Sequence, residues 1–237
     1  MMKRTIFLGT MCLCLIGFAS GLTAQISATI ALTGTVLDES SRKPVTVTLN
    51  ILDETGKKVN STRSIEKEGG AYYVILQPGT RYRVQIENPA YFREEFNFET
   101  PKSSKYAEVT RDWLVRPMTV GAKIHLPVSP FEYKKSRMRA GADIMLTQLR
   151  SAMVMNPGVK FEISCFPDLA ESKDANTKLT TDRATTLRDY FIKGGVSPDR
   201  IQIRPSAEID PLNPIPLRKG AKGRRYVGVT YVTLLKV

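Results

Sequence analysis

Histidine and cysteine are scarce in this sequence, and it has no recognisable catalytic motif. The 237 residues include one histidine, three cysteines and one tryptophan. The histidine, His125, lies in a predicted strand between apolar neighbours, so no cluster of metal ligands can be built around it. The chain also has no glycine-rich phosphate loop, no nucleophile elbow and no paired acid and base signature. We therefore predict a protein that is not an enzyme and that uses no cofactor.

The apolar run at residues 6–18 is far shorter than the roughly 20 residues that a membrane-spanning helix needs. It follows Lys3 and Arg4 and leads to small residues that end at Ala24. This layout predicts a secretory signal peptide at residues 1–24. Cleavage would leave Cys165 as the sole cysteine, so no internal disulfide can form and the thiol is expected in a small apolar role.

Net charge differs between the two halves of the predicted mature chain. Residues 25–117 carry 13 lysines and arginines against 12 aspartates and glutamates, whereas residues 118–237 carry 20 against 11. An excess of positive charge raises the local concentration of anionic partners. Nucleic acid is not expected, because export is predicted and the basic segments lack interleaved aromatic residues. The basic half therefore favours anionic lipid or cell-wall carboxylates, unless it is a solvated surface that aids solubility.

The N-terminal half alternates apolar and polar residues as β-strands do. Residues 45–51 place valine, leucine or isoleucine at every second position, and residues 82–86 repeat the pattern after a β-rich run at 71–76. A Gln-Pro-Gly-Thr turn at residues 77–80 separates the last two. With no convincing helix in this half, we predict an antiparallel sandwich of about seven strands.

Aromatic residues are frequent in this half and admit two interpretations. We expect them to fill the core of the sandwich or brace its edge. The alternative is an exposed sugar-stacking surface, and its candidates are Tyr72, Tyr73, Tyr82, Tyr91, Phe92, Phe96 and Phe98.

Two segments of the N-terminal half resemble a known family. They are GTVLDESSRKPV at residues 34–45 and GAYYVILQPGTRYRVQIE at residues 70–87, which are similar to carboxypeptidase regulatory-like domains. The resemblance covers residues 30–115. It implies a transthyretin-like β-sandwich, here residues 25–117, that serves as a binding or spacer module rather than as an enzyme.

The C-terminal half mixes strand and helix signals. In chain order, the predicted elements are a strand at 120–126, a helix at 138–155, a strand at 161–165, a helix from an N-cap near Thr180 to Gly194, and strands at 200–204 and 226–235. The first helix repeats apolar residues at helical spacing, and the following strand alternates. We therefore predict an α+β unit of order β-α-β-α-β-β with both helices packed on one sheet.

A stretch of this half resembles the OmpA-like domain. Residues 168–201, DLAESKDANTKLTTDRATTLRDYFIKGGVSPDRI, are similar to that family's core pattern "TD…N..LS..RA..V..YL...G". The resemblance covers residues 118–235 and implies a peptidoglycan-binding OmpA-like domain at residues 118–237. In that family an aspartate after the first strand and an arginine near the start of the second helix hold the diaminopimelate of the peptide stem. The matching positions are Asp168 and Arg183.

The resemblance implies further site residues. Asn176 and Leu179 match positions between the paired aspartate and arginine, and GRRYVGV at residues 223–229 is similar to the family's closing motif, which adds Arg224 and Arg225. One departure stands out, because the family's GHTD is replaced by Cys-Phe-Pro-Asp at residues 165–168. The proline in this segment removes a backbone donor.

The chemistry of the pair agrees with such a ligand. Diaminopimelate carries an ammonium and a carboxylate on one stereocentre, and an aspartate and an arginine complement both. With a helix starting near Thr180, Arg183 would lie in its first turn, where free backbone N–H groups also attract a carboxylate. A second interpretation stays open, in which Asp168 and Arg183 form an internal ion pair and hold no ligand.

Together these features predict a non-catalytic tether in the periplasm, associated with the outer membrane peripherally or indirectly. Its partners would be peptidoglycan, bound by the C-terminal domain, and an envelope protein, contacted by the sandwich. One alternative is an OmpA-like domain that no longer binds the wall and acts as a protein-interaction module in a secretion or motility complex. Another is an exported carbohydrate-binding protein whose sandwich recognises the glycan.

Overall fold

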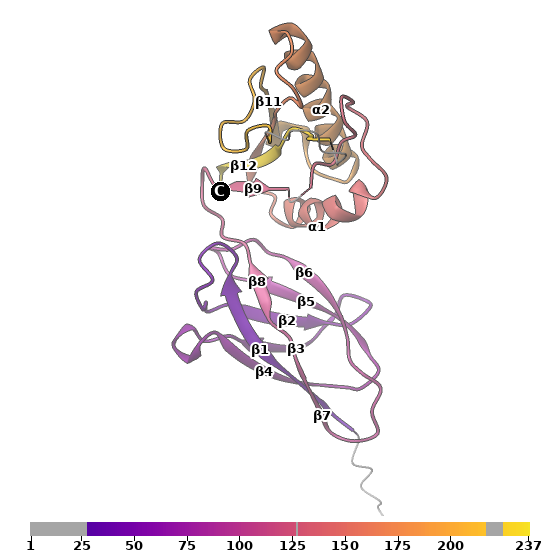
Figure 1. Ribbon diagram of the computed structural model, residues 1–237. Helices are drawn as coiled ribbons and strands as arrows, with labels where there is room; N and C mark the ends of the chain where they lie inside the picture. Colours follow the sequence, from indigo (N-terminus) through magenta and orange to yellow (C-terminus); the bar gives the residue numbers. More distant parts are fainter. Residues whose placement is uncertain (1–27, 127, 217–224) are drawn as a thin grey trace, which may run out of the picture.

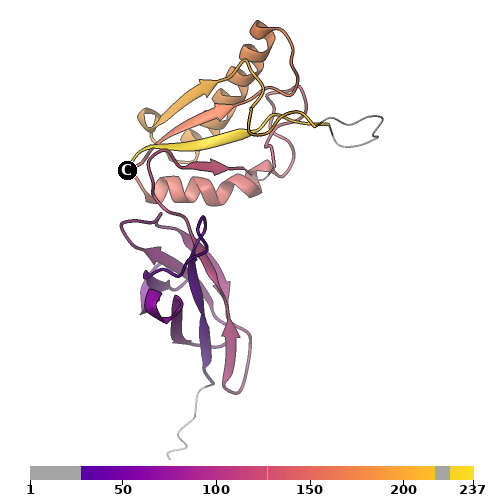
Figure 2. The same cartoon turned by 60° about the vertical axis from the view of Figure 1, so that its left-hand side comes forward.

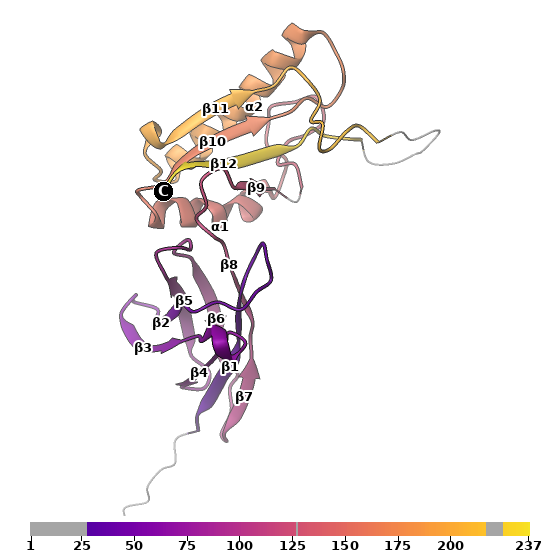
Figure 3. The same cartoon turned by 90° about the vertical axis from the view of Figure 1, so that its left-hand side faces the viewer.

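A computed structural model of the chain describes residues 28–126, 128–216 and 225–237. A β-sandwich forms one end of the molecule and an α+β unit forms the other, with helix α1 at the junction between them (Figures 1 and 3). No helix in the described part of the chain is long and apolar enough to cross a membrane. The predicted signal peptide at residues 1–24 lies outside the described residues.

The sandwich contains eight strands, one more than predicted. They are β1 (Ile30–Asp38), β2 (Thr48–Leu52), β3 (Lys58–Arg63), β4 (Ala71–Leu76), β5 (Arg81–Glu87), β6 (Glu95–Glu99), β7 (Ala107–Thr110) and β8 (Trp113–Val115). One sheet has the order β4-β1-β7, with β8 also paired to β1, and the other has the order β3-β2-β5-β6. Side chains from both sheets share one hydrophobic core, so the prediction of a β-sandwich is confirmed.

Alternation explains which faces of these strands are buried. Leu49, Ile51, Val84 and Ile86 are fully buried between the sheets, as the period of two predicted. β4 follows the same rule on the opposite sheet, with Tyr72 buried and its neighbours facing outward. The turn at residues 77–80 carries the chain from one sheet to the other, because β4 and β5 belong to different sheets.

Most of the aromatic residues lie in a core rather than on a surface. Tyr72, Tyr82 and Phe98 are buried in the sandwich, and Phe96 and Tyr91 are partly buried against it. Tyr73 is the exception, with 54% of its surface exposed. The seven residues therefore do not form one exposed sugar-stacking surface.

The C-terminal unit has the predicted order of elements. They are β9 (Lys123–His125), α1 (Ala142–Met155), β10 (Lys160–Cys165), α2 (Lys173–Lys193), β11 (Ile201–Pro205) and β12 (Thr230–Lys236). The sheet order is β11-β10-β12-β9, so β12 inserts between the first two strands of the unit. Figure 2 shows the sheet with its helices, and the shared core of α1, α2 and β10 confirms that both helices pack on one face.

The predicted start of the second helix is wrong. α2 begins at Lys173, and the Ser172 hydroxyl caps it by accepting a hydrogen bond from the Ala175 N–H at 3.3 Å. Residues 173–179 resemble a polar loop because most of their side chains face solvent from the first turns of the helix. Arg183 therefore lies at the middle of α2. The helix macrodipole acts only within the terminal turn, so the expected contribution of the helix end to this site does not apply.

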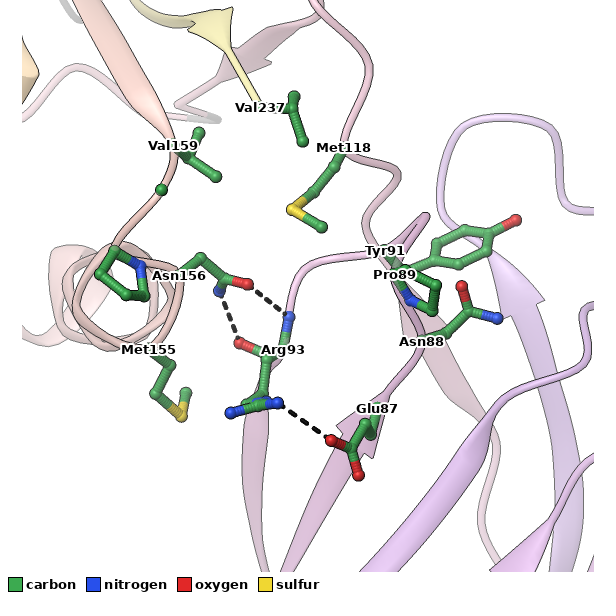
Figure 4. A pocket seen from close by; sticks show the side chains of 12 residues that line it. Glu87, Asn88, Pro89, Tyr91, Arg93, Met118, Met155, Asn156, Val159 and Val237 are labelled. Atoms are coloured by element: carbon green, nitrogen blue, oxygen red, sulfur yellow. Dashed lines mark hydrogen bonds and ion pairs between the residues drawn. The ribbon is translucent and has the colours of Figure 1, made fainter.

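Phe92 joins the two units. It lies in the segment between β5 and β6, yet it is buried in the C-terminal core, where its ring stacks on Phe161 with centroids 6.3 Å apart. Next to it, the Arg93 N–H donates to Asn156 Oδ1 and Asn156 Nδ2 donates to the Arg93 carbonyl, both at 3.0 Å (Figure 4). The chain order alone places Phe92 before the predicted boundary at residue 117, so this insertion was not expected.

A buried carboxylate also lies at the junction. Glu94 is 3% exposed and contacts Arg116 at 3.0 Å, while Arg116 contacts Glu39 with its other side. Burial raises the pKa of Glu94 above its ordinary value of 4.5, Arg116 opposes that rise, and Glu39 adds to it. The folded protein therefore holds the Glu94 proton more tightly than the unfolded chain does.

We expect this carboxylate to make the folded state less stable as pH rises from 4.5 through the raised pKa of Glu94. The Glu94→Gln variant cannot ionise at this position and should lose that part of the pH dependence. Urea unfolding of wild type and variant, measured from acid to neutral pH, should show the variant gaining relative to wild type across this window. Parallel curves would show that Glu94 titrates as it does in the unfolded chain.

Candidate functional site

The structure brings Asp168 and Arg183 into direct contact. Arg183 extends from the middle of α2 toward the segment after β10, where Asp168 lies. Its Nη1 donates to Asp168 Oδ1 at 2.5 Å and its Nη2 donates to Oδ2 at 2.8 Å. Arg183 and Asp168 are 0% and 1% exposed. The pair is thus a bidentate, fully buried ion pair, the geometry in which charge-assisted hydrogen bonds are strongest.

A loop covers this pair, and we call residues 131–138 the covering loop. Its ends are joined by a bridge between Phe131 and Met138. Inside it, the Glu132 and Lys135 carbonyls accept hydrogen bonds from Arg183 Nη2 and Nε at 3.1 and 2.9 Å. The guanidinium also lies over the ring of Phe131, 5.2 Å from its centroid.

Asp168 is equally well satisfied. Oδ2 accepts the Lys134 N–H at 2.6 Å and Oδ1 accepts the Gly228 N–H at 2.7 Å, in addition to the two contacts from Arg183. Lys134 has a φ of 56°, in the left-handed region, which a residue with a side chain adopts only at some energetic cost. The hydrogen bond to Asp168 is one contact that holds the covering loop in this conformation.

Gly228 is required where residues 225–229, which we call the closing segment, cross the segment before Asp168. A Cβ at this position would lie 1.9 Å from the Phe166 carbonyl oxygen. Only glycine can therefore bring its N–H within reach of Asp168 here. The Cys-Phe-Pro-Asp segment at residues 165–168 still pairs with the strand beside it, because the Phe166 N–H donates to the Val229 carbonyl at 3.0 Å.

The exposed rim of the site comes from the covering loop and the closing segment. Tyr133 is half-buried, and its ring lies beneath two cations, with Arg225 5.0 Å and Lys134 5.9 Å from its centroid. The Lys134 ammonium also pairs with Glu171, and that hydrogen bond raises the pKa of Lys134. Sequence reasoning missed Tyr133 and Lys134, whose places depend on the fold of the loop.

The other predicted site residues lie in different surroundings. Asn176 is 4% exposed and donates to the Ala207 carbonyl at 2.9 Å, so it anchors the loop after β11. Leu179 is half-buried on α2, one turn before Arg183. Arg225 is exposed at the rim, and Arg224 lies outside the described residues.

Cys165 sits directly beneath the site but does not act as an exposed thiol. It is fully buried, and burial raises its pKa to about 12, although the Thr230 hydrogen bond and the Arg183 charge lower it. Within the described residues, no group of three or more metal-ligating side chains could hold a metal ion.

Comparisons with known proteins give the following matches. Residues 130–222 match the model of the OmpA family. No curated protein matches the chain. The peptidoglycan-associated lipoprotein from Burkholderia pseudomallei is a structural neighbour with 13% identity, which covers 47% of this chain and 88% of that chain at a TM-score of 0.37.

Two further solved structures match with partial coverage. The Bacillus anthracis TIE protein is 18% identical, covering 41% of this chain and 19% of that chain at a TM-score of 0.33. Hydroxyquinol 1,2-dioxygenase from Pseudomonas putida DLL-E4 is 10% identical, covering 38% and 57% at a TM-score of 0.30. The chain thus spans less than two thirds of the length of either protein.

Proposed function

We propose that the protein is a non-catalytic tether of the cell envelope that binds peptidoglycan, because residues 130–222 match the OmpA family. In this proposal Asp168 and Arg183 hold the free ammonium and carboxylate of diaminopimelate in the peptide stem. The protein works in the periplasm next to the outer membrane, and residues 25–117 form a transthyretin-like spacer or binding domain that contacts an envelope protein.

One observation supports the proposal above all, namely the kind of partner that each charged group now has. The covering loop gives Arg183 two carbonyl oxygens and gives Asp168 one N–H group. A ligand carboxylate would replace acceptors at Arg183, and a ligand ammonium would replace a donor at Asp168. Each buried group would exchange one partner for another of the same type, so neither would be left unsatisfied.

Access to the pair requires the covering loop to move, and its outer contacts are weak. Lys134 pairs with Glu171 outside the loop, through side chains that are 48% and 42% exposed, whereas the pairs of Glu132 with Lys135 and Arg137 lie within the loop and can move with it. Exposed ion pairs of this kind contribute about 0–1 kcal/mol each. Release of Lys134 from its left-handed conformation would offset part of the energy needed to open the loop.

The rim offers further contacts to a peptide stem. Arg225 and Lys134 present two cations next to the ring of Tyr133, and stem peptides carry free carboxylates. Arg224 is a candidate for the same role. These exposed cations would attract the wall polymer at a distance, while the buried pair would select the diaminopimelate group.

The test is co-sedimentation of the mature protein with purified sacculi in the presence of competing stem peptides. We expect a free stem peptide that contains diaminopimelate to release the protein at about a tenfold lower concentration than the same peptide with lysine, which lacks the second carboxylate. Conservative variants, Asp168→Asn and Arg183→Lys, should pellet less than wild type. Lys160→Ala, an exposed cation at the opposite end of β10, should pellet normally.

Equal competition by the two peptides would contradict diaminopimelate binding, whatever the variants do. Absence of pelleting at moderate salt would contradict wall binding altogether. The protein-interaction module would then be favoured, because Asp168 and Arg183 already satisfy each other together with the backbone groups around them. The pair would in that case serve only to shape the domain.

A further inference from the structure

A cavity of about 950 Å³ lies between the sandwich and the helical face of the C-terminal unit. Strand β6 and residues next to it form one wall, and α1 with the end of α2 forms the other. Figure 1 shows α1 directly above the ends of the sandwich strands on this side. The cavity is separate from the Asp168 site, and none of the residues discussed there lines it.

Positive charge dominates this cavity. Its lining includes Arg83, Arg111, Arg150 and Lys193 but one carboxylate, Glu95, which is paired with Arg83 at 2.9 Å. In the described part of the chain, Arg111, Arg150 and Lys193 take part in no ion pair. Three cations therefore face one space without an internal counter-charge, which favours an anionic ligand.

Arg150 is held in place by packing. The stem of Arg150 crosses Gly194, where a Cβ would lie 2.1 Å from Arg150 Cδ, and its guanidinium lies 5.4 Å from the ring centroid of Tyr190. An acceptor that entered the cavity would therefore meet a positioned cation at Arg150.

Strand β6 presents an open backbone edge to the same space. It is the last strand of the order β3-β2-β5-β6. The hydrogen bonds from Ile86 N–H to the Glu94 carbonyl and from Thr100 N–H to the Thr80 carbonyl show that even-numbered residues face β5. By the alternation of antiparallel ladders, the N–H and C=O groups of Glu95 and Asn97 point away from β5. An extended peptide can add to such an edge as a further strand.

Apolar side chains complete the wall opposite β6. Ile144 is 78% exposed and Val154 is 42% exposed, and both line the cavity from α1. Exposed large apolar residues beside cations suit a ligand that has both carboxylates and an apolar side chain.

We propose that this cavity docks an extended acidic peptide segment of another protein, which adds a strand to β6. Its carboxylates contact Arg111, Arg150 and Lys193, and its apolar side chain packs on Ile144 and Val154. Among anionic ligands, a peptide is favoured over a phospholipid or a nucleic acid because only a peptide backbone pairs with a strand edge. This surface locates the envelope protein partner of the proposed function but does not depend on peptidoglycan binding.

The experiment measures binding of a fluorescein-labelled peptide in which glutamate and threonine alternate around a central valine. Fluorescence anisotropy gives the affinity, and Trp113 emission gives an independent signal, because this residue contacts Phe96 and Arg111 at the cavity. We expect the Arg150→Gln/Lys193→Gln double variant to bind about tenfold more weakly. Lys160→Gln removes an exposed charge outside the cavity and should bind as wild type does.

Two matched peptides and two other anionic probes decide whether the site recognises a strand. The same peptide with N-methyl groups on alternate residues should lose most of its affinity, and the peptide with lysine in place of glutamate should not bind. Equal binding of the N-methylated peptide, of polyphosphate or of phosphatidylglycerol vesicles would overturn the proposal in favour of a general anion-binding surface. Unchanged affinity in the double variant would overturn it as well. Sacculus pelleting of the double variant should equal that of wild type, so this test and that of wall binding fail independently.

Discussion

The Arg183→Met variant should lose about 3–5 kcal/mol of unfolding free energy, because it leaves the carboxylate of Asp168 buried without its counter-charge. Asp168→Leu should lower the unfolding free energy by a similar amount, since it leaves the guanidinium of Arg183 buried without a counter-charge. Both side chains are 1% exposed or less, so water cannot replace the lost partner. The covering loop should loosen in both variants, because three of its backbone contacts end on this pair.

Replacement of both residues together should restore part of the lost stability, because no unpaired charge then remains. The matched control lies on the same helix, where Lys178 and Asp182 form an exposed pair at 3.3 Å. Its removal should change stability by less than about 0.5 kcal/mol. Urea unfolding followed by far-ultraviolet circular dichroism reports this unit, because both described α-helices belong to it. If Arg183→Met and the control have similar effects, the pair is solvated and the buried geometry is incorrect.

The Phe92→Ala variant should destabilise the C-terminal unit by about 3–5 kcal/mol, although the residue belongs to a segment between two sandwich strands. Its ring is 1% exposed and stacks on Phe161 in the core of the C-terminal unit. Truncation leaves a cavity under α1 and removes the apolar contact that fixes one unit against the other. The hydrogen bonds between Arg93 and Asn156 are exposed and cannot compensate for that loss.

Phe98→Ala is the matched control, since Phe98 is buried in the core of the sandwich itself. Trp113, the single tryptophan, lies in that core and reports its unfolding by fluorescence. We expect Phe92→Ala to lower the midpoint of the helical signal and Phe98→Ala to lower the midpoint of the tryptophan signal. The opposite assignment would show that Phe92 stabilises the sandwich and does not join the two units.

Much of the fold could be predicted where a strand has one buried and one exposed face. Leu49 and Ile51 in the sandwich, and Phe161 and Ile163 in the C-terminal sheet, alternate with polar residues and are buried as expected. The predicted start of α2 was wrong because the first turns of this helix have no continuous buried face. Its first turns face solvent on most sides, so their composition resembles a loop, and only the cap at Ser172 marks the helix.

The OmpA-like resemblance singled out Asp168 and Arg183 as ligand-binding residues, and the structure places the two side chains in direct contact, as the alternative of an internal ion pair predicted. The covering loop over this pair could not be predicted. Glu132 and Lys135 reach Arg183 through backbone carbonyls, which every residue has, so no side-chain pattern marks them. Phe92 was missed for a related reason, because nothing in its local sequence distinguishes one core from another.

The pairing of β1 also determines how the sandwich would carry a mechanical load. β1 runs parallel to β7 and β8, with Ile30 opposite Ala107 and Asp38 opposite Val115. A pull applied at Ile30 and at Val115 in opposite directions would act along the strands, so the ladder hydrogen bonds would be sheared together and not broken one after another. If the C-terminal domain were bound to the wall and the N-terminal end were attached elsewhere, tension would load these parallel strand pairs in shear. Shear is the loading direction in which a β-ladder resists extension most.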